Sequence, residues 1–541
     1  MSVNRHASHP RDRHRARRRD ARALSQRGMV TLLGVFTLLL ALMLTGLTLE
    51  TARLWLTKRE LQSTADMAAM AAARHTGCGS TRTSALQAAQ SVVTANGLTS
   101  GYSLDLQRGI HGRDATTRVN TFQANESESS NAAQVTLTRT VEPSVLASGL
   151  LSSNSTVMKV TATAKGGPPQ AAFSIGSFAS ITQSQATFIT NLFRAILGNS
   201  NLNLGVAALT DLAGTSVNLL ALQAAAGAAT IEELLDRQVP IDELLRWLAT
   251  ASPSAAAATQ LNQLGSISVN SGLKVRLRDV LNIQVPASAA SATVNINVLD
   301  LVQTSLLVGK GKGTINLGMN ITGVGGITLN LLNPPRIAIG PAGKSLSGAW
   351  CTQTQSAQMS IKVGLNPLNL GIVDMALYLD LLSTSGQLAS LSIAPGNTQG
   401  QIEVGSTLVS LRLRNNADTN MASVFGGLLQ VGLNIPVGDA KGGAAAFNIA
   451  STAELPKTVQ TSGVGSGTFA GLLGQDTSLV IKVLGLGGDL LKPLVNFFVS
   501  PVLATVGALV IDPLLNALGI DIGLVRVKLN DVESAKPVLI I

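Results

Sequence analysis

The sequence predicts an α+β protein with a single N-terminal transmembrane helix that continues as a long helix, a small α+β module, and a large domain of mainly antiparallel amphipathic strands plus helices. Three observations predict this fold class. Residues 29–49 carry no charge, residues 50–75 contain neither Gly nor Pro, and apolar and polar residues alternate between about 291 and 414. Alternation with period two is typical of strands that have one buried face.

The first 49 residues predict a membrane anchor with a basic tail. Residues 1–28 contain nine arginines and two aspartates, which supply +7 of the net charge of +10. As a helix, residues 29–49 would span about 31 Å, which matches a hydrocarbon core of about 30 Å. Because positive charge stays on the cytoplasmic side, we expect residues 1–28 in the cytoplasm and the bulk of the chain across the membrane. The excess charge lies in a tail and not on a folded face, which argues against nucleic-acid binding.

The anchor could be a cleaved signal peptide, a trimmed pilin leader or a retained helix. A cleaved signal has an apolar run of roughly 7–15 residues and a small-residue cleavage site. This run is longer, and Leu49-Glu-Thr-Ala-Arg-Leu-Trp55 follows it without such a site. Retention as a signal anchor is therefore favoured.

The helix is expected to continue beyond the membrane. Leu54, Leu61, Ala65, Ala68 and Ala72 recur at helical spacing and predict one apolar stripe. Glycines 77 and 79 would end the helix. Residues 29–75 would then form a rod of about 70 Å.

This segment resembles the N-terminal part of TadE/TadG-like proteins of bacterial tight-adherence (Flp, type IVc) pilus assembly systems. The family-motif residues are Gly28, Glu50, Arg53, Gln62 and Asp66, together with Leu54, Trp55, Leu61, Ala65, Ala68, Ala69 and Ala71 to Ala73. The resemblance implies an inner (cytoplasmic) membrane protein with a periplasmic body and pilus-assembly proteins as partners.

The resemblance also bears on processing at Gly28. Pilin-like members are cut after such a glycine and carry a Glu five residues beyond the cut, where this chain has Leu33. The departure favours the TadG-like branch, which keeps its anchor. Some TadG proteins carry a von Willebrand A domain with a D-x-S-x-S metal motif, and the sequence lacks that motif.

Beyond the anchor, we expect a module at residues 50–166 and a large periplasmic domain at 167–541. Residues 80–98 are predicted to be helical, residues 123–132 form a polar loop, and Gly166-Gly-Pro-Pro169 is the best candidate linker. Alternating runs between residues 100 and 166 predict short strands.

The large domain should begin with helices over residues 172–251. Five carboxylates gather in residues 230–247, where Thr230 and Glu233 predict a capping box. Spacing predicts ion pairs from Glu233 to Arg237 and from Asp242 to Arg246. This structural interpretation is favoured over an acid/base site.

Strands should follow the helices. The predicted inward-facing residues are Val294, Ile296, Val298, Ile315, Leu317, Met319, Ile321, Ile327, Leu329, Leu331, Met359, Ile361, Val363, Leu365, Leu377, Leu379, Leu381, Val525, Val527 and Leu529. Residues 491–512 are apolar enough for a second membrane span, but Asn496 and Pro501 favour a buried helical hairpin.

The sequence lacks histidine-based and phosphate-loop patterns, and no constellation of residues points to carboxylate-only or Ser/Lys catalysis. The five histidines all lie at or before His111, so the large domain has no His-dependent triad or zinc site. No phosphate-binding glycine loop occurs. We expect neither catalysis nor a cofactor nor a metal site.

Two cysteines, Cys78 and Cys351, are the only ones in the chain. If the body is periplasmic, the oxidising compartment favours a disulfide between them. The alternative is two unpaired buried thiols.

The leading functional hypothesis is a structural or assembly component of a Flp-type pilus or a related adhesion system. The alternative is a membrane-anchored module that scaffolds or binds an amphiphile, since amphipathic sheets with few aromatic residues could enclose one. Association with lipid or with further copies of the chain is left open.

Overall fold

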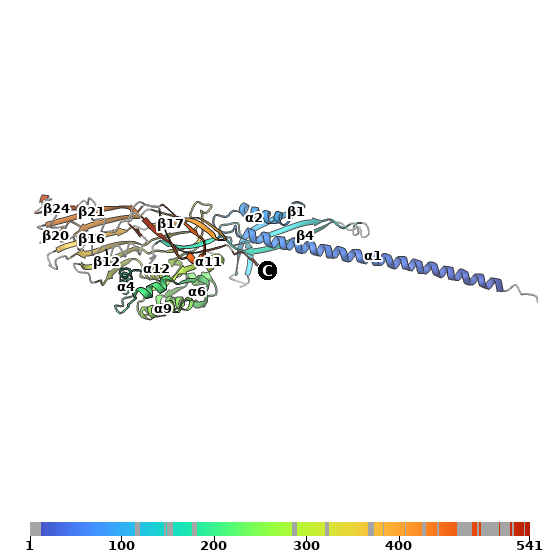
Figure 1. The fold of residues 1–541 in the computed structure, drawn as a ribbon, viewed down its shortest axis with the longest axis horizontal. Coiled ribbons are helices and arrows are strands. Elements are labelled where there is room, and N and C mark those ends of the chain that lie inside the picture. The colour runs from blue at the N-terminus through green and yellow to red at the C-terminus, as the bar shows by residue number, and fades with distance from the viewer. Residues whose placement is uncertain are drawn as a thin grey trace, which may run out of the picture.

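In the computed structural model, the chain forms a long rod, a small module and a large domain in line (Figure 1). The structure describes residues 12–113, 120–144, 148, 155–175, 181–283, 289–319, 324–365, 373–381, 384–405, 407–424, 429–440, 443–461, 479–483, 486–487, 508, 520–521, 524–534 and 536–540. The predicted α+β class, with a long N-terminal helix and several antiparallel sheets, is confirmed.

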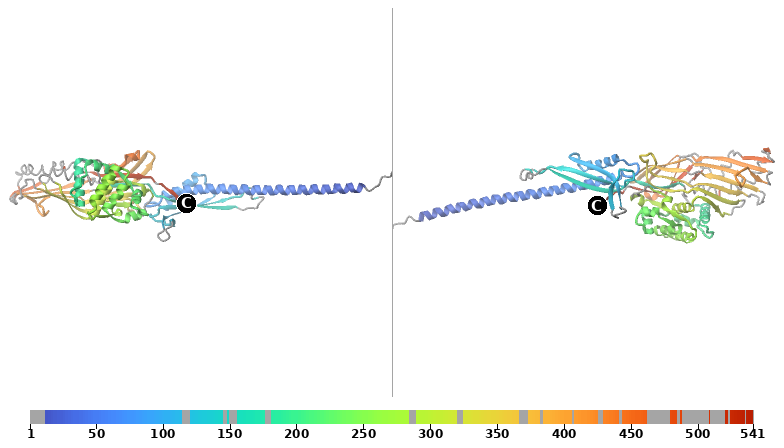
Figure 2. Two further views of the ribbon diagram at one scale, coloured as in Figure 1. Left: turned by 90° about the horizontal axis from the view of Figure 1, so that it is seen from below. Right: turned by 180° about the vertical axis from the view of Figure 1, so that it is seen from behind.

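Helix α1 (Asp12–Ala73) is the rod, and it projects far beyond the rest of the molecule (Figure 2). It begins within the predicted tail and ends two residues before the predicted end. Its part from Met29 to Ala73 is long and apolar enough to cross a membrane. The apolar side chains between Met29 and Leu49 are almost all exposed, as a lipid-facing helix requires.

The small module packs the second half of α1 and helix α2 against one antiparallel sheet. Its strands run in the order β2-β1-β3-β4-β28. The elements are α2 (Arg82–Ala95), β1 (Tyr102–Arg113), β2 (Asn120–Ala124), β3 (Ala132–Val141), β4 (Thr156–Lys165) and β28 (Val538–Ile540).

Four of the five predicted stripe residues, Leu61, Ala65, Ala68 and Ala72, are buried in this module's core, and Leu54 is half-buried. They meet apolar side chains of α2, β1, β3 and β4. Small side chains on the helix let its backbone come close to the sheet. The sequence contains no sign that strand β28, near residue 540, would join this sheet beside β4.

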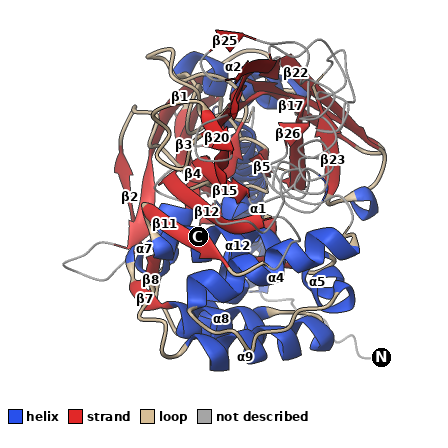
Figure 3. Cartoon of the chain, turned by 90° about the vertical axis from the view of Figure 1, so that its left-hand side faces the viewer, coloured by secondary structure: helices blue, strands red, loops and turns tan. Residues whose placement is uncertain are grey.

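The large domain begins with strand β5 (Gln170–Ile175), so the helical prediction was wrong for residues 172–175, and helices follow from Gln183. They lie on one side of the strands, which is clearest when the molecule is seen end-on (Figure 3). The helices are α4 (Gln183–Leu197), α5 (Val206–Ala213), α6 (Leu219–Ala226), α7 (Ile231–Asp236), α8 (Ile241–Ala251), α9 (Ala255–Ser268), α10 (Leu277–Val280), α11 (Ala289–Thr293), α12 (Val298–Lys310) and the 3-10 helix η2 (Thr452–Glu454).

Three larger sheets and two short strand pairs make up the rest of the described domain. One sheet joins β23 (Lys457–Gln460), β27 (Leu524–Glu533), β5 (Gln170–Ile175), β13 (Ile337–Pro341) and β9 (Leu281–Ile283), with β26 (Ile520–Asp521) beside β27. A four-stranded sheet joins β14 (Gln353–Gln355), β17 (Ser385–Ala394), β18 (Asn397–Val404) and β22 (Gly443–Ile449). The pairs are β6 (Ser216–Asn218) with β10 (Asn295–Asn297), and β7 (Gln238–Pro240) with β8 (Lys274–Arg276).

The longest sheet carries the predicted alternation. It contains β11 (Gly313–Leu317), β12 (Val324–Asn333), β15 (Gln358–Leu365), β16 (Val373–Leu381), β19 (Thr407–Arg414), β20 (Ala422–Val424), β21 (Leu429–Ala440), β24 (Leu479–Val483) and β25 (Leu486–Gly487). Leu329, Ile361 and Leu379 lie side by side on neighbouring strands, and all three are buried. Buried residues of the helices and sheets form one continuous core.

Two local predictions in this domain were wrong. Val298 does not continue a strand but opens α12, because the Asn297 side chain caps that helix by accepting from Asp300 N. Glu233 does not pair with Arg237. Its carboxylate accepts from Ala229 N at 2.9 Å, and Arg237 pairs with Glu243 at 3.6 Å.

Half of the predicted capping box is present, because Thr230 caps α7 while the Glu233 carboxylate accepts from Ala229 N and not from Thr230 N. The predicted pair between Asp242 and Arg246 is confirmed. The predicted hairpin or span at 491–512 lies outside the described residues, apart from residue 508.

A buried ion pair crosses the large domain's core. Lys528 of β27 lies 3.3 Å from Asp300 of α12, and their side chains are only 5% and 3% exposed. Ser174 of β5 donates to the other carboxylate oxygen at 3.3 Å. Because Val525, Val527 and Leu529 are the inward-facing residues predicted for β27, alternation would place Lys528 on an outward polar face. That second face is instead covered by helix α12, which brings Asp300 to Lys528.

Replacing Lys528 should test this pair. Lys528→Met leaves the Asp300 charge buried without its partner and is expected to destabilise the protein by about 3–5 kcal/mol. Lys528→Met with Asp300→Asn should recover part of that loss. Thermal unfolding in detergent measures both. The control is Lys457→Met, which removes an exposed pair with Glu454 and should cost less than about 1 kcal/mol. An equal effect of Lys528→Met and Lys457→Met would contradict the pairing.

Candidate functional site

The first polar contacts of the module form directly after the uncharged segment of α1, residues 29–49. Glu50 and Arg53 form an ion pair at 3.3 Å on the side of α1 that faces the sheet. Arg53 Nη2 also donates to the carbonyl oxygen of Glu142 at 2.8 Å. Glu142 directly follows β3, so this contact ties the end of the strand to the helix.

Ser144 completes this contact from the same segment. Hydrogen bonds from Ser144, and then the charge of Arg53, lower the pKa of Glu50 below its ordinary value of 4.5. The Glu50 side chain is only 12% exposed. The carboxylate therefore stays ionised at neutral pH and holds Ser144 and Arg53 together.

A second pair of motif residues binds the helix to β4, about three turns further along. Gln62 Nε2 donates to Asp66 Oδ1 at 2.8 Å and to the carbonyl oxygen of Thr161 at 3.3 Å. We call Glu50, Arg53, Gln62 and Asp66 the membrane-proximal clamp. The fifth motif residue, Gly28, lies in α1 one residue before the apolar part and outside the clamp.

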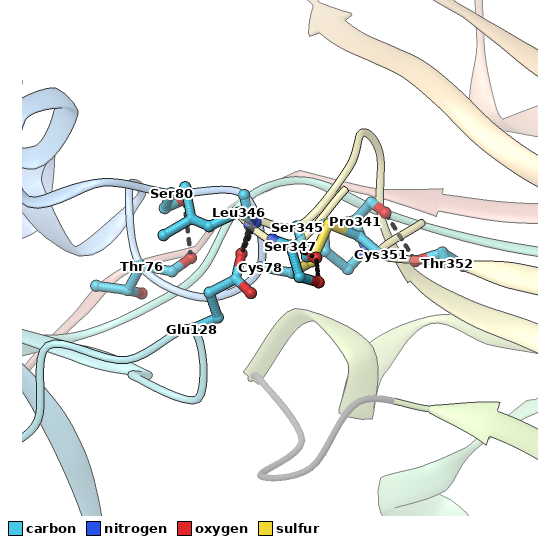
Figure 4. The surroundings of a disulfide bond; sticks show 11 residues. Thr76, Cys78, Ser80, Glu128, Pro341, Ser345, Leu346, Ser347, Cys351 and Thr352 are labelled. Atoms are coloured by element: carbon cyan, nitrogen blue, oxygen red, sulfur yellow. Dashed lines mark hydrogen bonds between the residues drawn. A yellow bond between two sulfur atoms is a disulfide. The ribbon is translucent and has the colours of Figure 1, made fainter. Parts of the chain in front are cut away.

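The two cysteines lie at the opposite end of the module, where it meets the large domain (Figure 4). Cys78 and Cys351 are bonded, with an S–S distance of 2.03 Å and a Cα–Cα distance of 5.7 Å. Glu128 lies beside them and accepts from Gly79 N at 2.9 Å and from Leu346 N at 2.7 Å. One carboxylate oxygen thus bridges the two parts of the chain.

Gly79 permits this close approach. Its φ is +72°, and a Cβ at this position would lie 2.7 Å from the carbonyl oxygen of Lys344. A side chain would therefore push the two loops apart. We call Cys78, Gly79, Glu128, Leu346 and Cys351 the junction.

The junction borders a small hollow of about 180 Å³, whose lining includes Thr76, Glu128, Asn131 and Gln170 as well as Pro168 and Pro341. Thr76 donates to the carbonyl oxygens of Ala73 and Gly166. The polar groups in the lining could bind a few ordered waters.

The contacts of the clamp and the junction hold distant segments of the chain in place. Among the described residues, no three His, Cys, Asp or Glu side chains lie close enough to hold a metal ion together. Sequence reasoning missed Glu128 because it lies in a polar loop whose composition gives no hint of a long-range partner. Its role depends on Leu346, 218 residues away.

The clamp and part of the junction lie within residues that match known family models. Residues 28–75 match the Flp pilus-assembly TadE/G-like family model, and residues 71–164 match the Tad-like Flp pilus-assembly family model. The resemblance predicted for the N-terminal segment is confirmed. The two matches cover about a quarter of the 541 residues. Neither a curated protein nor a solved structure matches the chain significantly.

The clamp generates a prediction with a defined pH dependence. A lowered pKa means that the Glu50 contacts stabilise the folded protein above about pH 4.5 and are lost as the pH falls through the lowered pKa. Glu50→Gln should therefore reduce amide protection of Val141, Glu142 and Ser144 at neutral pH. Hydrogen exchange measures this, and in the wild type the same loss should occur only in acid.

Glu60→Gln is the matched control, because Glu60 is an exposed carboxylate on the same helix. It should leave protection of Val141, Glu142 and Ser144 unchanged. Equal protection in Glu50→Gln and wild type at neutral pH would show that Glu50 does not hold this segment.

The cysteines generate a second prediction. Reduction should lower the stability of the protein by on the order of 2–4 kcal/mol, because it frees a loop of 273 residues. Thermal unfolding with and without reductant measures the change, and Cys78→Ser with Cys351→Ser should be insensitive to reductant. Free alkylation of both thiols without reductant, with identical gel mobility before and after reduction, would rule out the disulfide.

Proposed function

We propose that this protein, whose residues 28–164 match Tad-type Flp pilus-assembly families, is a membrane-anchored structural component of a Flp-type pilus assembly system. The observation that carries the proposal is the combination of an apolar helix fit to span a membrane with a module that clamps the same helix. The helix from residue 28 and the module apart from strand β28 lie almost entirely within the matched residues.

The proposal includes an orientation. Nine arginines before residue 29 favour a cytoplasmic N-terminus. The module and the large domain would then lie in the periplasm of a bacterium, with the anchor in the inner membrane. The bonded cysteines support this placement, because disulfides persist in oxidising compartments.

The proposed role is to hold a body at a fixed height above the membrane. From Glu50 to Ala73, α1 rises about 36 Å without a break. The clamp fastens the lower end of the module to the helix, and the junction fastens the upper end to the large domain. This rigid support would present the large domain to pilus-assembly partners. Such a role does not require catalysis.

The described hollows do not single out an amphiphile as ligand. The hollow at the junction, about 180 Å³, is smaller than the roughly 300–1,000 Å³ of typical ligand pockets. A wider hollow of about 550 Å³ on the four-stranded sheet has a mixed lining, with Phe447 and Leu391 beside Ser, Gln and Asn side chains.

A deletion strain tests the function. Cells without the protein should lose surface fibres and adhesion, and the wild-type gene should restore both. Arg53→Ala should restore them less well than Lys457→Ala, provided that immunoblots show equal protein in the membrane fraction. Normal fibres in the deletion strain would contradict the proposal.

Topology is tested separately on membrane-fraction protein. Intact mass should show a chain not cut after Gly28, and protease added from the periplasmic side should digest the body and spare residues 1–28. Digestion from the cytoplasmic side would reverse the proposed orientation.

A further inference from the structure

The outer side of α1 carries exposed apolar side chains beyond the uncharged segment. Trp55 is 60% exposed and Leu56 is 53% exposed. Glu50, Arg53 and Gln62 face the sheet from the same turns of the helix. The module therefore covers one side of these turns and leaves the other side apolar and open.

These side chains lie at the height of the lipid headgroups if residues 29–49 span the membrane. Trp55 is six residues beyond Leu49, which places its Cα about 9 Å past the end of the uncharged segment. Side chains of an α-helix lean toward the N-terminus of the helix, which is the membrane side here, so the Trp55 ring reaches back into the headgroup layer. The headgroup layer is about 5–8 Å thick on each side of the hydrocarbon core. Trp is enriched there because its ring is apolar and its N–H is polar.

Two cations adjoin the apolar pair. The guanidinium of Arg59 lies 5.6 Å from the centre of the Trp55 ring, and Lys58 is exposed beside it. A guanidinium stacked on an aromatic ring keeps its N–H groups free for a phosphate. Apolar groups below and cations above match the order of acyl chain and phosphate in a phospholipid.

We propose that Trp55, Leu56, Lys58 and Arg59 form an interfacial collar that seats in the headgroup layer and binds anionic phospholipids. The proposal rests on the membrane anchoring proposed above and names the surface that fixes the depth of the anchor. The occupant is lipid because the exposed apolar side of α1 runs from Met29 to Leu56 in continuity with the proposed span.

The collar also explains the position of the clamp. Glu142 and Ser144 are tied to Arg53 and Glu50, so the end of β3 is held at the height of the collar. The module would thus contact the membrane surface on one side of α1, and the collar would bind lipid on the other side. Two contacts on opposite sides of one helix resist tilting better than one.

The test uses the full-length protein in nanodiscs that contain brominated phospholipids, which quench nearby tryptophans. Wild-type fluorescence should fall, and Trp55→Phe should remove the quenched component. A matched control carries Trp55→Phe with Leu346→Trp, which places an exposed tryptophan at the junction instead. Bromolipid should not quench that variant, whereas aqueous acrylamide should.

The cations are tested by comparing brominated phosphatidylglycerol with brominated phosphatidylcholine. Wild-type protein should show preferential quenching of Trp55 by the anionic lipid. Lys58→Gln with Arg59→Gln should lower that preference by about fivefold for each cation removed. Equal quenching by the two lipids in wild-type protein would overturn the assignment of anionic phospholipid.

The outcomes separate this proposal from the one it rests on. Failure of the protein to elute with nanodiscs would overturn the membrane anchor itself. Elution with nanodiscs but with Trp55 quenched only by acrylamide would overturn the collar alone. Protection of Trp55 from both quenchers would show that protein, such as a second copy of the chain, covers this surface, and would also overturn the collar.

Discussion

The contact between the alanine-rich side of α1 and the sheet of the small module holds the anchor and the body together. Ala65, Ala68, Ala69 and Ala72 are fully buried there. Because their side chains are small, the helix lies close to the strands, and Gly166 lies so near Ala73 that a Cβ would come within 2.9 Å of its carbonyl oxygen. Apolar packing of this kind stabilises without fixing a register along the helix.

Polar contacts at the two ends of the small module, the clamp and the junction, fix the position of its sheet along α1. The clamp sets the height at which the sheet meets α1, and the junction sets how the large domain meets the module. In both places a carboxylate, Glu50 or Glu128, joins segments that are distant in sequence. The rod-like shape of the molecule (Figure 1) follows from these few directional contacts along an unbroken helix.

Much of this arrangement could be predicted from local sequence. The helical stripe from Leu61 to Ala72 and the alternation of Leu329, Ile361 and Leu379 depend on neighbours in the chain, and the structure agrees with both. The strand predicted to continue through Val298 ends at Asn297, because the Asn297 side chain caps helix α12 at this point. Lys528, Glu128 and strand β28 could not be placed, because their partners lie hundreds of residues away and only the tertiary fold brings them together.

The pairing of β28 with β4 has a consequence for the order of folding. Val538 to Ile540 cover residues 163–165 of β4, which the ribosome makes long before them. Until the last strand arrives, that edge of the sheet displays unpaired N–H and C=O groups, which attract other strands. Contacts between such distant segments also form slowly. A newly made chain therefore holds an open sheet edge beside helix α1 until residues 538–540 have been made.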